Sequence, residues 1–176
     1  IRHDTIAQTS QFDEHVETAG VATRLIYQSP NIATHHRMVR LNMGTPTYAR
    51  APGEAPGMFA LESAIDELAY ILNMDPLELR LRNYAEQYPD TKKPWSSKSL
   101  RECYVRGAQR FGWSARNMQP GVTRDGNILV GFGMATATYP ALSLPASARA
   151  RLDRDGMATV QSGTQEIGTG TTTVMS

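Results

Sequence analysis

Residues 163–170, with the sequence Gly-Thr-Gln-Glu-Ile-Gly-Thr-Gly, carry the pattern best suited to chemistry. They follow an alternating run at residues 157–162 that predicts a strand. A strand that leads into a Gly-x-Gly turn lets backbone N–H groups approach a ligand that a Cβ would keep away. If a helix follows, its free N–H groups favour an anion there. The sequence therefore predicts an anion-binding turn at Gly168, Thr169 and Gly170, with a purely structural tight turn as the alternative.

Arg50 is a second candidate for anion binding, because it lies in a loop rich in Pro and Gly at residues 47–57. A guanidinium matches phosphate and carboxylate geometry, and a solvated surface arginine is the alternative. Glu54 in the same loop could be a catalytic carboxylate, but we expect it to supply a favourable charge at the start of the next helix. His35 and His36 are adjacent on a predicted strand and point to opposite faces, so we predict no metal site.

Three helices are predicted in the middle of the chain, at about residues 55–113. In the first, apolar residues recur at spacings of three and four over residues 58–72, which predicts an apolar stripe that faces a core. Glu62, Asp66 and Glu67 lie off that stripe, and we expect them to form a solvated face.

Capping signals place the other two helices at residues 75–83 and 99–112. Each begins with a residue that suits the N-cap and has a glutamate three positions later, as in a capping box. The second helix also has a proline at its first position, and the third ends at a glycine. The residues that carry these signals are Asp75, Pro76, Glu78, Ser99, Glu102 and Gly112.

Alternating apolar and polar residues predict strands at 32–43, 128–138, 146–153 and 157–162, the last two joined as a hairpin. A short helix is predicted from Gln11 onward. The predicted fold class is therefore α+β, with mixed sheet strands, three helices in the middle and a β-rich part at about 127–170. We expect residues 1–176 to be a single partial domain of a larger protein, because a domain rarely ends six residues after a ligand-binding turn.

The composition excludes several classes of protein. A formal net charge of +1 argues against a dedicated nucleic-acid surface. The only cysteine, Cys103, excludes an internal disulfide and a metal site built from cysteines. No apolar run approaches the ~20 residues of a membrane span. We expect a soluble protein whose compartment the sequence leaves open, with the cytoplasm favoured over the periplasm.

Four blocks, taken in order, resemble the molybdenum-binding subunit of xanthine dehydrogenases and aldehyde oxidases. The first is the arginine- and glycine-bearing loop with its helix, at residues 47–62. The second, at 66–83, is similar to the next helices of that family. The third and fourth are Gly-Phe-Gly-Met at 131–134 and the glycine-rich run at 163–170. The bacterial separate-subunit enzymes of this family are the most similar.

The resemblance implies an oxidative hydroxylation of an aldehyde or an N-heterocycle with oxygen derived from water. It implies molybdopterin with molybdenum, in bacteria usually the cytosine dinucleotide form, and this cofactor performs the chemistry while the protein positions it. The partners implied are the remainder of the molybdopterin subunit, subunits that carry 2Fe-2S and FAD, and a small-molecule substrate.

Carried over by residue, the backbone of Ile167, Gly168, Thr169 and Gly170 would bind the pterin and its phosphate, and Arg50 would lie beside the metal. The family's general-base glutamate belongs to a Gly-Glu-x-Pro-type block, which we expect C-terminal of this chain. We therefore predict no catalytic residue within the chain and no catalysis by the chain alone.

The sequence departs from the family at three positions. Thr169 replaces a glutamine that contacts the cofactor in many members. Pro52 and Thr136 are predicted to lie near the substrate, and they stand where purine hydroxylases have phenylalanines. A flat purine would lose stacking worth ~1 kcal/mol per ring pair, which favours an aldehyde or another heterocycle over xanthine.

Two other functions fit the same sequence. A non-enzymatic module could bind an anion or a nucleotide with the turn at Gly168, Thr169 and Gly170. A helical interaction domain could dock a partner through the apolar stripes at 58–72 and 100–111. Burial of these stripes in the chain's own core would remove the motivation for the second alternative.

Overall fold

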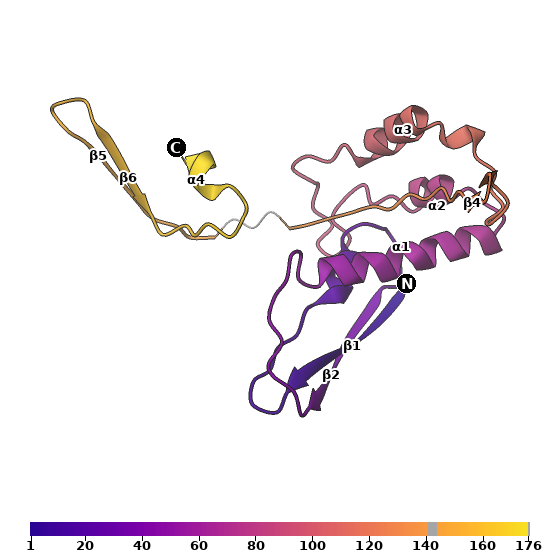
Figure 1. Cartoon of the computed structure of the whole chain (residues 1–176), viewed down its shortest axis with the longest axis horizontal. Helices are drawn as coiled ribbons and strands as arrows, with labels where there is room; N and C mark the ends of the chain where they lie inside the picture. The colour runs from indigo at the N-terminus through magenta and orange to yellow at the C-terminus, as the bar shows by residue number, and fades with distance from the viewer. Residues whose placement is uncertain (141–143, 176) are drawn as a thin grey trace. The chain divides into compact units, whose positions relative to one another are not determined.

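The computed structural model describes residues 1–140 and 144–175 and confirms the α+β class, with helices and small separate sheets (Figure 1). The chain divides into two compact units, Ile1–Tyr139 and Pro140–Ser176. Within the described residues, no helix is long and apolar enough to span a membrane.

The first unit begins with a two-stranded parallel sheet. Strand β1 (Arg2–Ser10) pairs with β2 (Ala33–Leu41), so that Arg2 lies opposite Ala33 and Ser10 opposite Leu41. Strand β2 lies within the predicted strand at 32–43, whereas β1 was not predicted. The helix predicted from Gln11 is wrong, because Gln11 lies in a bend and the connection instead holds a 3-10 helix, η1 (Ala19–Arg24).

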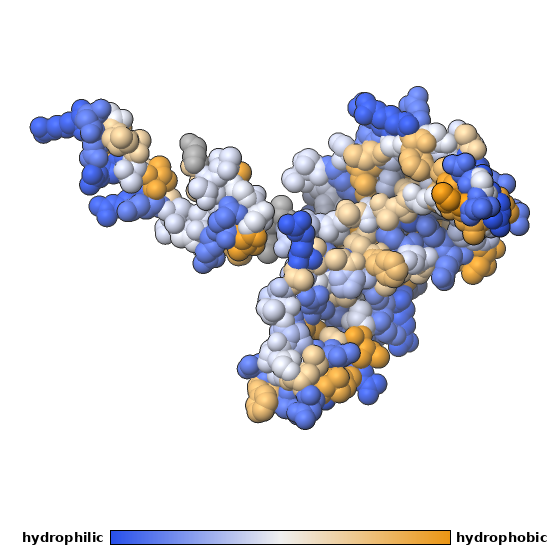
Figure 2. All heavy atoms as spheres, viewed as in Figure 1, coloured by the Kyte–Doolittle hydropathy of each residue, from blue (hydrophilic) through white to orange (hydrophobic). Residues whose placement is uncertain are grey.

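Helix α1 (Glu54–Ile71) is the long central helix of the first unit (Figure 1). Its apolar residues Met58, Leu61, Ile65 and Ala69 form the core with residues of η1 and with the segment that follows η1. The predicted stripe is therefore buried only in its first part, and it ends in Leu68 and Leu72, which are 43% and 51% exposed. Exposed apolar residues also occur elsewhere on the surface (Figure 2), among them Phe59 and Ile71 of α1.

Helices α2 (Pro76–Arg82) and α3 (Leu100–Phe111) confirm the other two predicted helices. Asp75 is the N-cap of α2, since its Oδ1 accepts a 2.7 Å hydrogen bond from the Leu77 N–H. Gly112 ends α3 in the left-handed conformation at φ 74°, as the sequence predicts. The capping boxes do not form: Glu78 pairs with Arg82 instead, and the side chain that begins α3 makes no capping hydrogen bond.

The predicted strand at 128–138 is wrong over most of its length. Only a two-residue strand, β4 (Ile128–Leu129), is present, and it pairs with β3 (Arg124–Asp125). Residues 130–140 continue without joining a strand of the described sheets. A short 3-10 helix, η2 (Trp113–Ala115), follows α3 and orients the buried Trp113.

The second unit contains the predicted hairpin. Strand β5 (Ala148–Leu152) pairs with β6 (Ala158–Ser162), with Gly156 at φ 85° in the turn. Every residue of both strands is exposed, so this unit buries little apolar surface of its own. A short helix, α4 (Thr171–Met175), follows the glycine-rich turn.

Gly57 lets α1 approach η1 closely, and its substitution tests this packing. A Cβ at Gly57 would lie 1.9 Å from the Ala19 carbonyl oxygen. We expect Gly57→Ala to lower the free energy of unfolding by about 1–3 kcal/mol through overpacking. Gly107→Ala in α3 is the matched control, because its Cβ would meet no atom within 4 Å. That change should raise the free energy of unfolding by about 0.5–1 kcal/mol. Urea unfolding measures both changes, and equal effects would contradict the packing.

Candidate functional site

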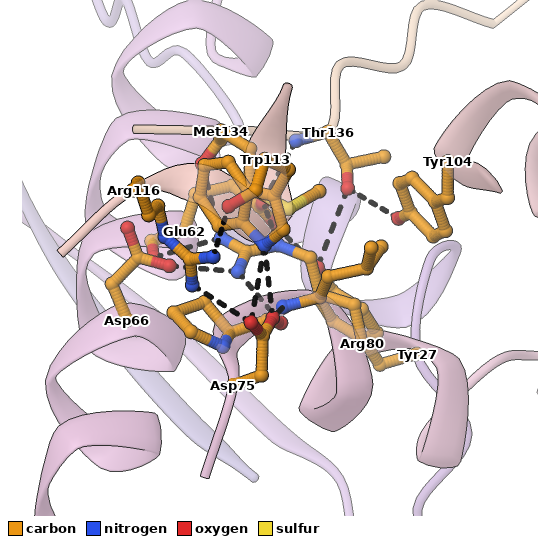
Figure 3. A network of polar contacts seen from close by, with 12 residues as sticks. Tyr27, Glu62, Asp66, Asp75, Arg80, Tyr104, Trp113, Arg116, Met134 and Thr136 are labelled. Carbon is orange, nitrogen blue, oxygen red and sulfur yellow. Dashed lines mark hydrogen bonds and ion pairs between the residues drawn. The ribbon is translucent and has the colours of Figure 1, made fainter. Parts of the chain in front are cut away.

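A buried ion pair joins α1 to α2 in the first unit (Figure 3). Arg80 is fully buried, and its Nε donates a 2.8 Å hydrogen bond to Glu62 Oε2. Its Nη1 donates to Asp66 Oδ1 at 2.7 Å and to the Pro76 carbonyl at 3.1 Å. Burial alone would lower the pKa of Arg80, but Glu62, Tyr27 and Asp66 together outweigh burial and raise it, so that the guanidinium stays charged.

The prediction that Glu62 belongs to a solvated face is wrong, because Glu62 is only 4% exposed. Both members of the ion pair lie at helical spacing from buried residues of their own helix. Glu62 is four residues after Met58 and three before Ile65, and Arg80 is four after Pro76. This spacing is the signal that could have found the pair, since it places both charges on the buried faces.

Tyr27 forms a further hydrogen bond with the Glu62 carboxylate. Its hydroxyl donates a 2.5 Å hydrogen bond to Glu62 Oε1. Burial, together with the nearby carboxylate, raises the pKa of Tyr27 well above its usual value, so that the hydroxyl remains a donor. Thr136 is also close to Tyr27, with its Oγ1 3.4 Å from the Tyr27 hydroxyl.

Thr136, predicted to be near the substrate, is 4% exposed and is held within this network (Figure 3). Its N–H donates to Glu62 Oε2 at 2.7 Å, and its hydroxyl shares a hydrogen bond with the Tyr104 hydroxyl of α3. Two residues earlier, the Met134 carbonyl accepts from Arg80 Nη2 at 3.3 Å. Side chains of α1, α2 and α3 therefore fix this extended segment.

Thr136 also lines an apolar hollow of about 340 Å³ between α3 and residues 133–137. Trp113 forms another part of its wall and is fixed by its indole N–H, which donates to the Asp75 carboxylate. Burial alone would raise the pKa of Asp75, but hydrogen bonds, first of all from Arg116, outweigh burial and lower it. Asp75 therefore caps α2 and also anchors this wall as an anion. The lining side chains include Leu100, Cys103, Tyr104, Phe111, Trp113 and Met134.

The loop before α1 holds the other two predicted residues of the first unit. Arg50 is exposed, and the structure shows no ion pair between it and the described residues. Pro52 is half-buried at the end of the loop, where the Gly53 N–H donates to Glu17 Oε2 at 3.1 Å. Glu54 is buried in the first turn of α1, the place in which a negative charge is favourable.

The glycine-rich turn of the second unit brings the remaining predicted residues together. Gly168 and Gly170 adopt φ values of 89° and 78°, a region open to glycine without strain. Their N–H groups donate to Glu166 Oε1 at 2.7 and 3.1 Å, and the Thr172 N–H donates to Oε2 at 3.2 Å. The N–H groups of Thr172 and Gly170 make the largest contributions that lower the pKa of Glu166. The turn therefore presents converging amide donors to a negatively charged group.

Glu166 was not predicted to take part in the turn, although it stands two residues before the first glycine. The side chain of Ile167 is 80% exposed, and the Thr169 hydroxyl lies 2.9 Å from that of Thr171. Across residues 1–140 and 144–175, no group of three or more His, Cys, Asp or Glu side chains could hold a metal ion.

Comparisons with known proteins identify the family of this chain. Two family models, both described as molybdopterin cofactor-binding domains, match residues 2–84 and 106–176. The aldehyde oxidoreductase molybdenum-binding subunit PaoC of Escherichia coli K12 is 41% identical over 160 residues, or 90% of this chain and 22% of that protein. The xanthine dehydrogenase molybdenum-binding subunit of E. coli O157:H7 is 32% identical over 186 residues, or 98% of this chain and 24% of that protein.

Solved structures share the fold. The aldehyde oxidoreductase of Desulfovibrio gigas superposes with a TM-score of 0.56 at 22% identity, over 89% of this chain and 18% of that one. The enzyme of Desulfovibrio desulfuricans ATCC 27774 gives 0.55 at 24% identity, over 64% of this chain and 13% of that one.

The chain belongs to the molybdopterin cofactor-binding domain family, that of the molybdenum-binding subunits of aldehyde oxidoreductases and xanthine dehydrogenases. This confirms the resemblance found in the sequence. The chain spans about a quarter of the length of the curated relatives that it matches.

The hydrogen bonds to Glu166 predict a specific pH dependence of the turn. Because the folded pKa of Glu166 is lowered, these bonds persist above the usual glutamate pKa and are lost as the pH falls through the lowered value. In an NMR titration, the amide resonances of Gly168 and Gly170 should shift with a midpoint below that of an ordinary glutamate. Glu166→Gln is the control and should abolish the transition. A midpoint at or above the ordinary value would contradict the arrangement.

Proposed function

We propose that this chain is part of a molybdenum hydroxylase subunit that binds molybdopterin, in the cytosine dinucleotide form, and oxidises an aldehyde or an N-heterocycle with oxygen derived from water. The observation that carries the proposal is the convergence of the Gly168, Gly170 and Thr172 amides on the Glu166 carboxylate. That carboxylate is a stand-in for an anion, and a phosphate oxygen offers the same amides an acceptor of the same charge. The donor set of the turn therefore fits the phosphate of the cofactor.

Each predicted site residue has a defined part in this proposal. The backbone of Ile167, Gly168, Thr169 and Gly170 would hold the pterin and its phosphate. Arg50 would add a positive charge, and its exposure and lack of a partner among the described residues leave it able to do so. The bound molybdenum cofactor would supply the oxidative hydroxylation.

In this proposal, the chain's own residues bind and orient the cofactor and the substrate, and they do not transfer protons. The general base is expected in the C-terminal remainder of the subunit, and 2Fe-2S and FAD on partner subunits would carry the electrons away. Thr136 and Pro52 would shape the substrate site. The hollow beside Thr136 supports an apolar or aromatic substrate, since its lining side chains are mostly apolar and aromatic.

Cofactor analysis of the full-length protein tests the proposal. Inductively coupled plasma mass spectrometry should find molybdenum, and oxidation of the released pterin to its fluorescent form should find an equimolar amount of pterin. Hydrolysis should also release cytidine monophosphate. Bound nucleotide or phosphate without molybdenum and pterin would contradict the proposal and favour the non-enzymatic anion-binding alternative.

The substrate preference follows from Pro52 and Thr136. Without phenylalanines at these positions, a purine loses stacking worth ~1 kcal/mol per ring pair, so kcat/KM for an aromatic aldehyde should exceed that for xanthine by about tenfold or more. Steady-state kinetics of the full-length enzyme with both substrates measure this ratio. Turnover of xanthine at a rate that rivals the aldehyde would overturn the preference.

A further inference from the structure

Residues 130–140 belong to no strand of the described sheets, yet two backbone groups of this segment are bound by buried side chains. The Thr136 N–H donates to Glu62 Oε2 at 2.7 Å. The Met134 carbonyl accepts from Arg80 Nη2 at 3.3 Å. Glu62 and Arg80 are themselves joined at 2.8 Å, so a single ion pair holds both groups (Figure 3).

This pattern is the one that a neighbouring parallel strand would supply. In a parallel sheet, one residue donates its N–H to a carbonyl on the next strand and accepts from the N–H two residues further along that strand. Here the carbonyl of Met134 and the N–H of Thr136 are the two groups, and they flank Ala135. Arg80 takes the place of the donor, and Glu62 takes the place of the acceptor.

Hydrogen bonds from other groups hold the ion pair in place, so that it can bind the segment as a neighbouring strand would. Asp66 and the Pro76 carbonyl bind further N–H groups of Arg80, and the Tyr27 hydroxyl binds the second oxygen of Glu62. Hydrogen bonds to charged groups are shorter and about twice as strong as neutral ones. Because both side chains are buried and each is held by several hydrogen bonds, the backbone that they bind is fixed with them.

We infer that Glu62 and Arg80 are positioning residues that fix residues 134–136 in place of a missing strand, and thereby set Thr136 and the wall of the hollow that it lines. The structural part of this inference depends only on the contacts above. Its consequence for the substrate rests on the proposed function, because Thr136 is predicted to be near the substrate.

The competing explanation is that the ion pair only holds α1 and α2 together. Asp66 distinguishes this explanation from a positioning role. Asp66 pairs with Arg80 at 2.7 Å from α1, as Glu62 does, but no hydrogen bond joins it to residues 134–136. If the ion pair only held the two helices together, residues 134–136 would respond to substitution of Asp66 as they do to substitution of Glu62. A positioning role requires that the substitution of Glu62 loosen the segment and that the substitution of Asp66 leave it unchanged.

The experiment uses the full-length subunit with Glu62→Gln, Asp66→Asn and Glu78→Gln, the last of which breaks an exposed pair on α2. Hydrogen–deuterium exchange is followed in peptides that cover residues 131–137. We expect Glu62→Gln to speed exchange there by about tenfold, because a neutral acceptor replaces a charged one. The other two variants should exchange as the wild type does.

Kinetics provide the second readout. With molybdenum content equal to that of the wild type, Glu62→Gln should raise the KM for an aldehyde several-fold and change kcat less, since the substrate wall rather than the cofactor is displaced. If Glu62→Gln does not fold, Glu62→Asp keeps the charge but shortens the side chain, and it should show the same faster exchange.

Equal exchange in the Glu62 and Asp66 variants, or no change in residues 131–137, would overturn the positioning role. Absence of molybdenum from the wild type would count against the proposed function alone, because the exchange measurement does not depend on the cofactor.

Discussion

The arrangement of the first unit depends on the burial of one positive charge, that of Arg80. A buried guanidinium without partners would be prohibitively unfavourable, so its surroundings must supply acceptors in the correct geometry. Carboxylates of α1 and carbonyls of α2 and of the segment at 133–137 meet this demand. The packing of α2 on α1 and the path of the later segment are therefore coupled, because all of them satisfy the same side chain.

The features that the sequence predicts correctly are those that depend on residues close together in the chain. The N-cap at Asp75, the end of α3 at Gly112 and the hairpin of β5 and β6 depend on neighbouring residues, and the sequence predicts each of them. The sequence does not predict strand β1, because its only apolar residues, Ile6 and Ala7, are adjacent and give no alternation. Its pairing depends instead on β2, some 30 residues away.

The wrong predictions around the site also concern contacts between residues that are far apart in the chain. The sequence predicts a solvated Glu62 because a charged residue is normally solvated, and only the packing of α2 reveals its partner. The alternation at 128–138 does indicate an extended backbone, but it cannot show that side chains rather than a strand would bind it. For Ile167, Gly168, Thr169 and Gly170 the sequence predicted a turn with glycine geometry, whereas the carboxylate in contact with its amides emerged only from the fold.

The carboxylate of Glu166 gives the glycine-rich turn an occupant supplied by the chain itself. Any incoming anion competes with a tethered group at high effective concentration, so weakly coordinating ions such as chloride gain little by exchange. A doubly charged phosphate ester that also makes contacts elsewhere can win this competition. Under the proposed function, the turn would thereby select large, multiply anchored ligands. Its amide donors are meanwhile satisfied by Glu166.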